Sequence, residues 1–315
     1  MSGEFDLIAR LAAAVPCRRR DVVLGPGDDA AVLRPPRSGQ LVQTVDTCIE
    51  GLHFPAGLQP GDVGWHCLAV NLSDLAAMGA VPAWALLSLT LPSADEAWID
   101  GFAAGFGALA ERWDVDLVGG DLTRGPLSVT IALTGFVPRG EALTRSGAAP
   151  GDGVWVTGTL GAGAGGLAAW RRGDSAGAAA FLRPEPRLAE GQALRGVASS
   201  AIDVSDGLAA DLGHVLDASG VGAVVNLELV PLAPAARGDG ADAGLRMALY
   251  GGDDYQLCFT VPRKLEKALA KAAAGWAAPP SRVGEIRREP GLSLALLGRE
   301  IDLAGRGWDH FGDAS

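Results

Sequence analysis

Lysine is almost absent from this chain of 315 residues: Lys264, Lys267 and Lys271 are the only three. All three lie in one stretch that we expect to be helical. A P-loop carries a lysine after its glycines, and a protein kinase carries one on an early strand, so the sequence excludes both nucleotide sites. If the protein handles phosphate, cations other than lysine must neutralise it.

Cysteine is also scarce, since only Cys17, Cys48, Cys67 and Cys258 occur, without a CxxC pair or a zinc-binding spacing. Such a set is typical of reduced thiols in a cytosolic protein. The start MSGEFDLIAR lacks the basic-then-apolar pattern of a signal sequence, and no run of about 18 apolar residues occurs. These absences predict a cytoplasmic protein with no membrane segment.

Basic residues are outnumbered, with 26 Lys and Arg against 37 Asp and Glu, for a net charge of −11. Because a nucleic-acid-binding surface is basic, we expect no nucleic-acid partner. Hydrophobic residues make up 48% of the chain, which is enough to bury a full core. The length favours about two domains.

What the chain does have is a recurring set of short acidic motifs. Each alone is compatible with a simple turn or a helix cap, but together they bring many carboxylates and few basic partners, of which Arg124 and Arg145 are the clear candidates. Two bare carboxylates about 4 Å apart repel by roughly 4 kcal/mol at an effective dielectric constant of 20. Mg²⁺ prefers such oxygens and typically bridges them to phosphates. The sequence therefore predicts a site for divalent metals and phosphate, formed by GPGDDAAVL (25–33), TVDT (44–47), NLSDLAAMG (71–79), GGDLTRG (119–125), DVSDG (203–207) and GGDD (251–254).

The first half of the chain predicts long strands and about three helices. Apolar spacing favours a helix over 3–15, and a strand over 41–47 places Thr44 and Asp46 on one face. A helix from Pro60 should end at Gly79, and its spacing places Asn71, Asp74 and Met78 on one face. We further expect a strand at 83–91, a helix from a capping box at 93–96 to about 112, and strands over VDLVGGD and LSVTIALTGFV.

A loop at 138–153, rich in Gly, Pro and charge, is the best candidate for a domain boundary. Beyond it we expect strands at 154–158, ending at 204, at 222–229 and at 255–261, and helices near 186–198, at 207–219 and over the lysines. The segment GAGAGGL at 161–167 has the letters of a dinucleotide fingerprint, but no acidic residue ends a second strand about 20 residues later. A hinge or the entry to a helix is the favoured interpretation.

Several longer motifs occur in order across nearly the whole chain, and with them it resembles the thiamine-monophosphate kinases of the aminoimidazole-ribonucleotide-synthetase-like superfamily. The resemblance implies an α+β fold of two domains, 1–138 for ATP and metal binding and for dimerisation, and 149–315, of α/β type, to complete the active site. It implies a homodimer formed through the N-terminal sheets, and ATP-dependent, Mg²⁺-assisted phosphorylation of thiamine monophosphate to thiamine diphosphate. We expect the long apolar strands at 83–91 and 127–137 to offer the exposed edge that such a homodimer would cover. No Ser, His or Cys is placed as an obvious phosphoryl carrier, so direct in-line transfer is expected. The motifs are GEFDLIARL, GPGDDAAVL, VDTCIEGLHF, AVNLSDLAAMGAVPAW, GGDLTRGPLSVT, ALTRSGAAPGD, AIDVSDGLAADLGHV and GGDDYQLCFTVP.

The same resemblance assigns site residues. Asp28 matches the other half of the first acidic pair, without a definite role. The segment GGDDYQL departs from the usual GGEDYEL, with Asp253 and Gln256 in place of Glu, which puts the geometry of the substrate pocket in question. The expected metal ligands are Asp29, Thr44, Val45 through its carbonyl, Asp46, Asp74, Asp121, Asp203 and Asp206; the ATP contacts are Gly120, Asp121, Arg145 and Ser205; the substrate contacts are His53, Asp253 and Trp308.

Three alternatives remain at the level of sequence. A related ATP-dependent amidine-forming synthase would use ATP to activate an amide oxygen. A selenophosphate synthetase is disfavoured because it would carry a reactive Cys or selenocysteine with a nearby lysine, and the N-terminal half has no lysine. A non-catalytic hydrogenase-maturation scaffold is expected to end in Cys, whereas this chain ends in HFGDAS.

Overall fold

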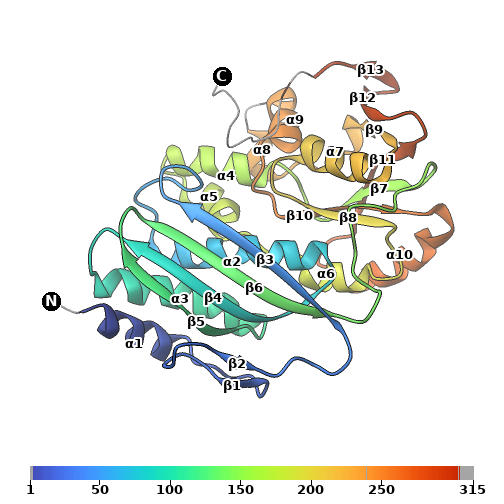
Figure 1. Cartoon of the computed structure of the whole chain (residues 1–315). Helices are drawn as coiled ribbons and strands as arrows, with labels where there is room; N and C mark the ends of the chain where they lie inside the picture. Colours follow the sequence, from blue (N-terminus) through green and yellow to red (C-terminus); the bar gives the residue numbers. More distant parts are fainter. Residues whose placement is uncertain (1–2, 239, 304, 306–315) are drawn as a thin grey trace. The chain divides into compact units, whose positions relative to one another are not determined.

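The computed structural model describes residues 3–238, 240–303 and 305 (Figure 1). The chain divides into two compact units, as the two-domain expectation requires. The first unit runs up to Leu75 and resumes over Ala80–Gly140, and the second takes Ala76–Gly79 and the chain from Glu141 onward. No helix among the described residues is long and apolar enough to cross a membrane.

A four-stranded sheet of order β3-β6-β4-β5 is the centre of the first unit. Only β4 and β5 pair in parallel; β6 is antiparallel to both of its neighbours. The helices α2 and α3 lie against one side of the sheet (Figure 1). The elements are α1 (Glu4–Ala14), β1 (Val22–Leu24), β2 (Val32–Leu33), β3 (Gln40–Ile49), α2 (Pro60–Ala77), β4 (Val81–Leu91), α3 (Glu96–Arg112), β5 (Asp116–Arg124) and β6 (Ser128–Val137).

The helix predicted from Pro60 is confirmed, including its stop: Gly79 has φ +66°, a left-handed conformation that glycine adopts without strain. The capping box predicted at 93–96 is wrong. Asp95 is the N-cap of α3, and its carboxylate accepts the N–H of Trp98 at 3.0 Å. The carboxylate of the residue directly before the helix therefore caps the N-terminus of α3, where the sequence predicted reciprocal capping by Ser93 and Glu96.

The other side of this sheet is open and partly apolar. Side chains at alternate positions of β3 project from it, with Leu41 54% and Val45 62% exposed, and Leu86 of β4 is 47% exposed. The expectation that strands 83–91 and 127–137 offer an apolar edge is wrong, because β4 and β6 are the two inner strands and have no unpaired edge. The apolar surface is a sheet face.

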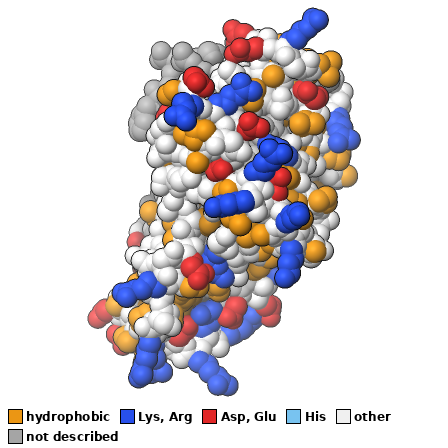
Figure 2. Space-filling view, turned by 90° about the vertical axis from the view of Figure 1, so that its right-hand side faces the viewer, with side chains coloured by type: hydrophobic (Ala, Val, Ile, Leu, Met, Phe, Trp, Pro, Cys, Tyr) orange, Lys and Arg blue, Asp and Glu red, His pale blue; other side chains and the backbone are white. Residues whose placement is uncertain are grey.

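The second unit is built on a seven-stranded sheet of order β13-β12-β9-β11-β7-β10-β8. The sequence reading missed β11 to β13 and the helices α5, α8 and α9, and it expected α6 and β9 to be longer than they are. Both charge signs are mixed on the face that Figure 2 shows. The elements are β7 (Gly153–Val156), α4 (Ala162–Arg171), α5 (Ser175–Leu182), α6 (Leu188–Ala193), β8 (Ser200–Val204), α7 (Leu208–Ser219), β9 (Gly222–Asn226), α8 (Pro234–Arg237), α9 (Ala241–Tyr250), β10 (Gln256–Val261), α10 (Glu266–Ala272), β11 (Ser281–Arg287), β12 (Gly291–Leu296) and β13 (Arg299–Ile301).

Candidate functional site

In the first unit, β3 and α2 bring together two of the predicted metal ligands. The hydroxyl of Thr44 donates a short hydrogen bond to Oδ2 of Asp74. Asp46 lies two residues along β3 from Thr44, so its side chain is on the same side of the strand. This side faces α2, and the hydroxyl and carboxylate oxygens gathered on it are of the kind that Mg²⁺ prefers.

Cys67 and Asn71 continue this face of α2. Cys67 lies against Cys48 of β3, and burial together with this neighbouring thiol raises the pKa of Cys67 well above its usual range. Asn71 is 1% exposed, and its Nδ2 donates to the carbonyl oxygen of Cys67 at 3.1 Å. Its Oδ1 is buried and has no hydrogen-bond partner within the described part of the chain. Such an orphaned oxygen fits a site that takes up a cation or water.

The acidic pair Asp28–Asp29 lies in the segment between β1 and β2. Oδ1 of Asp28 accepts the backbone N–H of Asp29 at 2.8 Å, so this carboxylate closes the local turn. Gly27 has φ +119°, a conformation open to glycine. Both aspartates are exposed to solvent. Because Asp28 is engaged in the turn, Asp29 is the better candidate for a metal ligand.

The register of the sheet places Asp121 on its open face. Asp121 is paired with Ser88, Ser88 with Thr130, and Thr130 with Thr47, so these side chains form one row. Thr44 and Asp46 alternate with Thr47 along β3 and point to the other face. Asp121 of this chain is therefore not brought to the Thr44–Asp74 group.

For Gly120 and Val45, the backbone is the part of the residue that matters for the candidate site. Gly120 has φ +154°, and a Cβ there would lie 1.8 Å from the carbonyl oxygen of Leu87, so no other residue fits. The side chain of Val45 projects from the open face, which leaves its carbonyl as the group that could bind a cation.

His53, a predicted substrate contact, follows β3 in a tight turn in which Gly51 donates to the carbonyl oxygen of Phe54 at 2.7 Å. Nδ1 of His53 accepts the backbone N–H of Ile49 at 3.0 Å. A neutral imidazole that accepts at Nδ1 carries its proton on Nε2. His53 therefore has an N–H donor of the kind that a substrate phosphate accepts.

In the second unit, three loops meet at one edge of the sheet. β10 is antiparallel to both β7 and β8, so the loops that follow β7 and β8 and the loop that precedes β10 share an edge. The N–H of Asp253 donates to the carbonyl oxygen of Ser205, and that of Tyr255 to Val204, both at 2.8 Å. The segments that carry the predicted ATP contact Ser205 and substrate contact Asp253 are thus hydrogen-bonded together.

The glycine-rich loop before α4 binds a carboxylate of the chain itself. Oδ2 of Asp254 accepts the N–H of Gly161 at 2.7 Å, and Oδ1 accepts the N–H of Gly163 at 3.0 Å. Burial raises the pKa of Asp254 to about 7, against the lowering effect of these hydrogen bonds. The segment is therefore the entry to a helix, as the sequence favoured, with Asp254 at the place where an external anion would otherwise bind.

Asp211, in the first turn of α7, was missed in the sequence. Its Oδ2 accepts the N–H groups of both Ser205 and Asp206 at 3.0 Å, which fixes the loop that carries the predicted ATP contact Ser205 and the predicted metal ligand Asp206. Burial, and then the charges of Asp203 and Asp206, raise the pKa of Asp211 to about 8. The signal in the sequence was an aspartate one helical turn after the DVSDG motif.

Asp253 and Gln256, the two departures from the family pattern, have different surroundings. Asp253 has φ +57°, and its Oδ1 accepts the hydroxyl of Tyr255 at 2.9 Å. Gln256 is buried, and its Oε1 accepts from Oγ1 of Thr157 at 3.0 Å and from Nε of Arg187 at 2.8 Å. Gln256 therefore belongs to a buried hydrogen-bond network, whereas Asp253 remains the predicted substrate contact of the two.

Arg145 is exposed in the chain segment that follows β6 and precedes β7, and its carbonyl oxygen accepts the hydroxyl of Ser219 at 3.4 Å. Trp308 lies outside the described residues.

Over the described chain, no three His, Cys, Asp or Glu side chains are close enough to hold a metal ion by themselves. Mg²⁺ commonly takes one or two carboxylates and completes its shell with water and phosphate, so the oxygen donors on α2 and β3 suit it.

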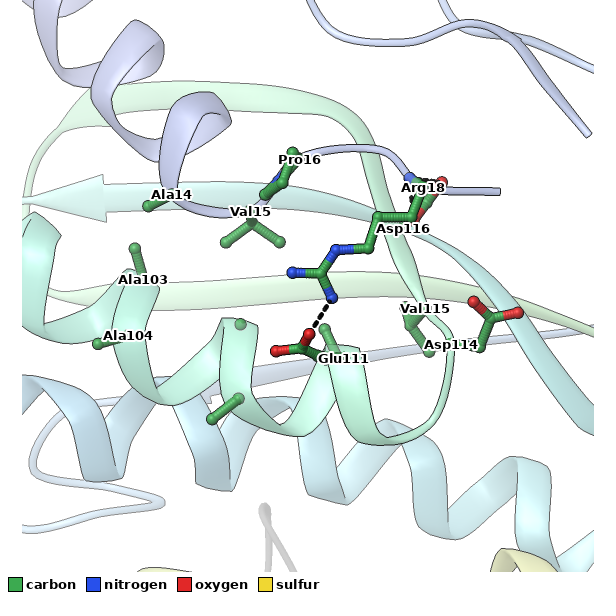
Figure 3. Close-up of a pocket in the computed structure, with 13 residues that line it drawn as sticks. Ala14, Val15, Pro16, Arg18, Ala103, Ala104, Glu111, Asp114, Val115 and Asp116 are labelled. Atoms are coloured by element: carbon green, nitrogen blue, oxygen red, sulfur yellow. Dashed lines mark hydrogen bonds and ion pairs between the residues drawn. The ribbon is translucent and has the colours of Figure 1, made fainter. Parts of the chain in front are cut away.

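The pocket in Figure 3 contains none of the predicted residues. It lies between the end of α1 and α3 in the first unit, and five of its thirteen lining residues are alanine. Arg18 forms an ion pair with Glu111 at 2.9 Å, and Asp116 accepts the backbone N–H groups of Arg18 and Arg19. Its charged groups are thus already engaged within the chain.

Comparison with known proteins bears on the whole chain. The family models for the N-terminal and C-terminal domains of AIR synthase related protein match residues 27–137 and 149–296. Thiamine-monophosphate kinase of Escherichia coli (strain K12) is 47% identical over 319 residues, covering 98% of each chain. The crystal structure of thiamine-monophosphate kinase from Stenotrophomonas maltophilia K279a is 46% identical, with a TM-score of 0.86, and covers 95% of this chain and 98% of that one. The structure of AaThiL complexed with AMPPCP and TMP is 30% identical, with a TM-score of 0.77, over 98% and 97%.

Proposed function

The chain belongs to the thiamine-monophosphate kinase family, and from this premise we propose that it transfers the γ-phosphoryl group of ATP to the phosphate of thiamine monophosphate. The products are thiamine diphosphate and ADP. The observation that carries the proposal is 47% identity over 98% of both chains. The purified protein, incubated with labelled ATP and thiamine monophosphate, should form labelled thiamine diphosphate. If ATP is consumed without that product, the amidine-forming synthase becomes the better proposal.

The transfer needs positioning and charge neutralisation more than covalent chemistry. An oxygen of the substrate phosphate attacks the γ-phosphorus in line, the bond to the β,γ-bridging oxygen breaks, and the electron pair leaves with ADP. Several Mg²⁺ ions, when bound, would neutralise the charge that develops on the phosphate oxygens. Inversion at a chiral γ-phosphorus is expected, and net retention would indicate a phosphorylated enzyme.

The first unit would hold Mg²⁺ through Thr44, Asp46 and Asp74, with Asp29 and the Val45 carbonyl as further oxygen donors. This assignment is supported by the hydrogen bond between Thr44 and Asp74 and by the orphaned oxygen of Asn71. His53 would donate Nε2–H to the phosphate of the substrate. The carboxylates act here by holding cations, so none of them needs to move a proton.

The second unit would contribute Asp203 and Asp206 as metal ligands and Ser205 as a nucleotide contact. Asp211 supports these roles because it binds the backbone N–H groups of Ser205 and Asp206 and so fixes the loop that carries their side chains. Arg145 would supply positive charge to ATP. Asp253 would balance the thiazolium charge or accept from the aminopyrimidine, together with Trp308.

A homodimer would cover the open face of the four-stranded sheet. Large apolar side chains such as Val45 and Leu86 are exposed on it, and such a patch commonly marks an interface. Asp121 and Gly120 lie on the same sheet, and Asp121 is on this face, away from the Thr44–Asp74 group of its own chain. We infer that Asp121 serves the metal site of a second copy.

Subunit mixing tests this arrangement. Asp121→Asn and Asp74→Asn should each be nearly inactive, whereas a mixed dimer contains one site with both aspartates intact. Mixing the two variants under conditions of subunit exchange should therefore restore activity. If the mixture stays inactive although exchange is demonstrated, Asp121 acts within its own chain. Sedimentation equilibrium should give a dimer at micromolar concentration, and Leu86→Asp should weaken it.

A further inference from the structure

The amide of Asn71 is an unexplained polar group in the middle of α2. It is almost fully buried, and one half of it is paired, since Nδ2 donates to the carbonyl oxygen of Cys67. This bond fixes which way the amide points, because a flipped amide would place its oxygen against that carbonyl oxygen. Oδ1 is then left buried without a partner in the described structure. A buried acceptor without a donor is costly, so the native protein requires a donor there.

The packing of α2 along β3 shows what Oδ1 lies near. Cys67 meets Cys48 at one end of the contact, and Asp74 meets Thr44 at the other. Between these ends the helix rises about 10 Å and the strand extends about 13 Å. Asn71 is near the middle of the helical segment, and Asp46 is the middle residue of the strand segment that faces α2. Asn71 and Asp46 are therefore opposite each other.

The carboxylate opposite Asn71 has no proton to donate, so the donor that the buried Oδ1 requires must be a bound water. We propose that Asn71 is a positioning residue of the metal site: its Oδ1 accepts a hydrogen bond from a water of the Mg²⁺ that Asp46 and Asp74 hold. Mg²⁺ dehydrates reluctantly and keeps several waters, and each water has two protons to donate. This inference rests on the proposed phosphoryl-transfer function.

The geometry has a consequence that a purely structural asparagine would not have. In Mg²⁺-free protein the Oδ1 oxygen is a buried group without its donor, so removing it is favourable. Asn71→Leu, which is similar in volume, also loses the bond from Nδ2 to the carbonyl oxygen of Cys67, but that oxygen keeps the backbone N–H of residue 71 as its helical partner. The two effects offset each other, so the variant should unfold close to the wild-type temperature when Mg²⁺ is absent. In the same variant, the MgCl₂ concentration that half-saturates thermal stabilisation at a fixed AMPPCP concentration should rise at least tenfold.

Asn71→Asp supplies a second test that keeps the oxygen. The added charge beside Asp46 and Asp74 should lower the unfolding temperature without Mg²⁺, and MgCl₂ should restore it at a lower concentration than wild type needs. Ser73→Ala, a buried change on another side of the same helix, is the control and should leave the Mg²⁺ response unchanged.

The results distinguish a failure of the role of Asn71 from a failure of the metal site itself. If Asn71→Leu loses stability in Mg²⁺-free buffer, or if Asn71→Asp has the Mg²⁺ response of wild type, Oδ1 is bonded within the fold and the proposal is overturned. If Asp74→Asn loses the Mg²⁺ response while Asn71→Leu keeps it, the metal site stands and only the role of Asn71 fails. If Asp74→Asn keeps the Mg²⁺ response, the proposed metal site itself is wrong.

Discussion

A single methyl group at Gly163 should disturb the segment that carries Asp253. A Cβ at this position would lie 2.4 Å from the carbonyl oxygen of Asp253, 2.5 Å from its carbonyl carbon and 2.6 Å from its Cβ. Ordinary contacts of this kind begin at 3.4 Å. In Gly163→Ala, Asp253 must therefore move by about 1 Å, as overpacked sites do.

The segment is poorly able to move, because its neighbours bind it on both sides. Asp253 donates to Ser205, Tyr255 donates to Val204, and Asp254 accepts from Gly163 itself. Overpacking costs about 1–3 kcal/mol, and the gain in helix propensity returns up to about 1 kcal/mol. We expect a net loss of about 1 kcal/mol, which lowers Tm by roughly 2–4 °C for a unit of this size. The KM for thiamine monophosphate should rise tenfold or more, since Asp253 is the predicted substrate contact.

Gly213→Ala is the matched control. Gly213 is also a helical glycine of the second unit, in α7, but a Cβ there meets nothing within 4 Å. It should gain up to about 1 kcal/mol of stability and leave both KM values unchanged. Thermal unfolding and steady-state kinetics measure both variants. If Gly163→Ala matched Gly213→Ala in Tm and in KM, the contact between α4 and the Asp253 segment would not govern the pocket.

Other predictions follow from individual carboxylates. Asp253→Ala should raise the KM for thiamine monophosphate by roughly tenfold or more, in line with about 1.5–3 kcal/mol for a charged hydrogen bond, and leave the KM for ATP unchanged. A lower kcat with unchanged KM would instead assign Asp253 to metal binding or phosphoryl transfer. Asp253→Glu should bind thiamine monophosphate at least as well as wild type. Asp203→Asn should lower kcat by orders of magnitude at limiting Mg²⁺ while circular dichroism shows an intact fold; a near-normal rate would exclude Asp203 as a ligand. Because burial raises the pKa of Asp254 to about 7, the folded chain keeps a proton between about pH 4 and 7 that the unfolded chain releases, so the free energy of unfolding should fall as pH rises through this range. Urea titrations of Asp254→Asn should show a smaller fall than wild type, and equal slopes would contradict the raised pKa.

The parts of the site that the sequence predicted well are those that local rules govern. Alternation along a strand places Thr44 and Asp46 on one face, and helical spacing places Asn71 and Asp74 on another. The structure joins these faces through the hydrogen bond between Thr44 and Asp74. Local periodicity is enough here because each pair lies within one regular element.

Contacts between residues that lie far apart in the sequence could not be predicted in the same way. Gln256 was expected to bear on the substrate pocket, yet its partner Arg187 is 69 residues away and its other partner Thr157 is 99 residues away. The order β3-β6-β4-β5 likewise turned two apolar strands from expected edges into inner strands. Strand order and buried polar partners depend on which elements pack together, and neither period nor composition records that.

Two pairs of adjacent aspartates, Asp28–Asp29 and Asp253–Asp254, show how the fold accommodates the repulsion between neighbouring carboxylates. In each pair, one member binds backbone N–H groups of the chain: Asp28 accepts from Asp29, and Asp254 accepts from Gly161 and Gly163. The carboxylate that binds the backbone fixes the loop, and the other is presented from that loop in a defined direction. A pair of aspartates in a glycine-rich turn therefore combines a structural group with a ligand-binding group. By this reasoning, Asp29 and Asp253 are the members to test for ligands, and replacing Asp28 or Asp254 should act through the conformation of the loop.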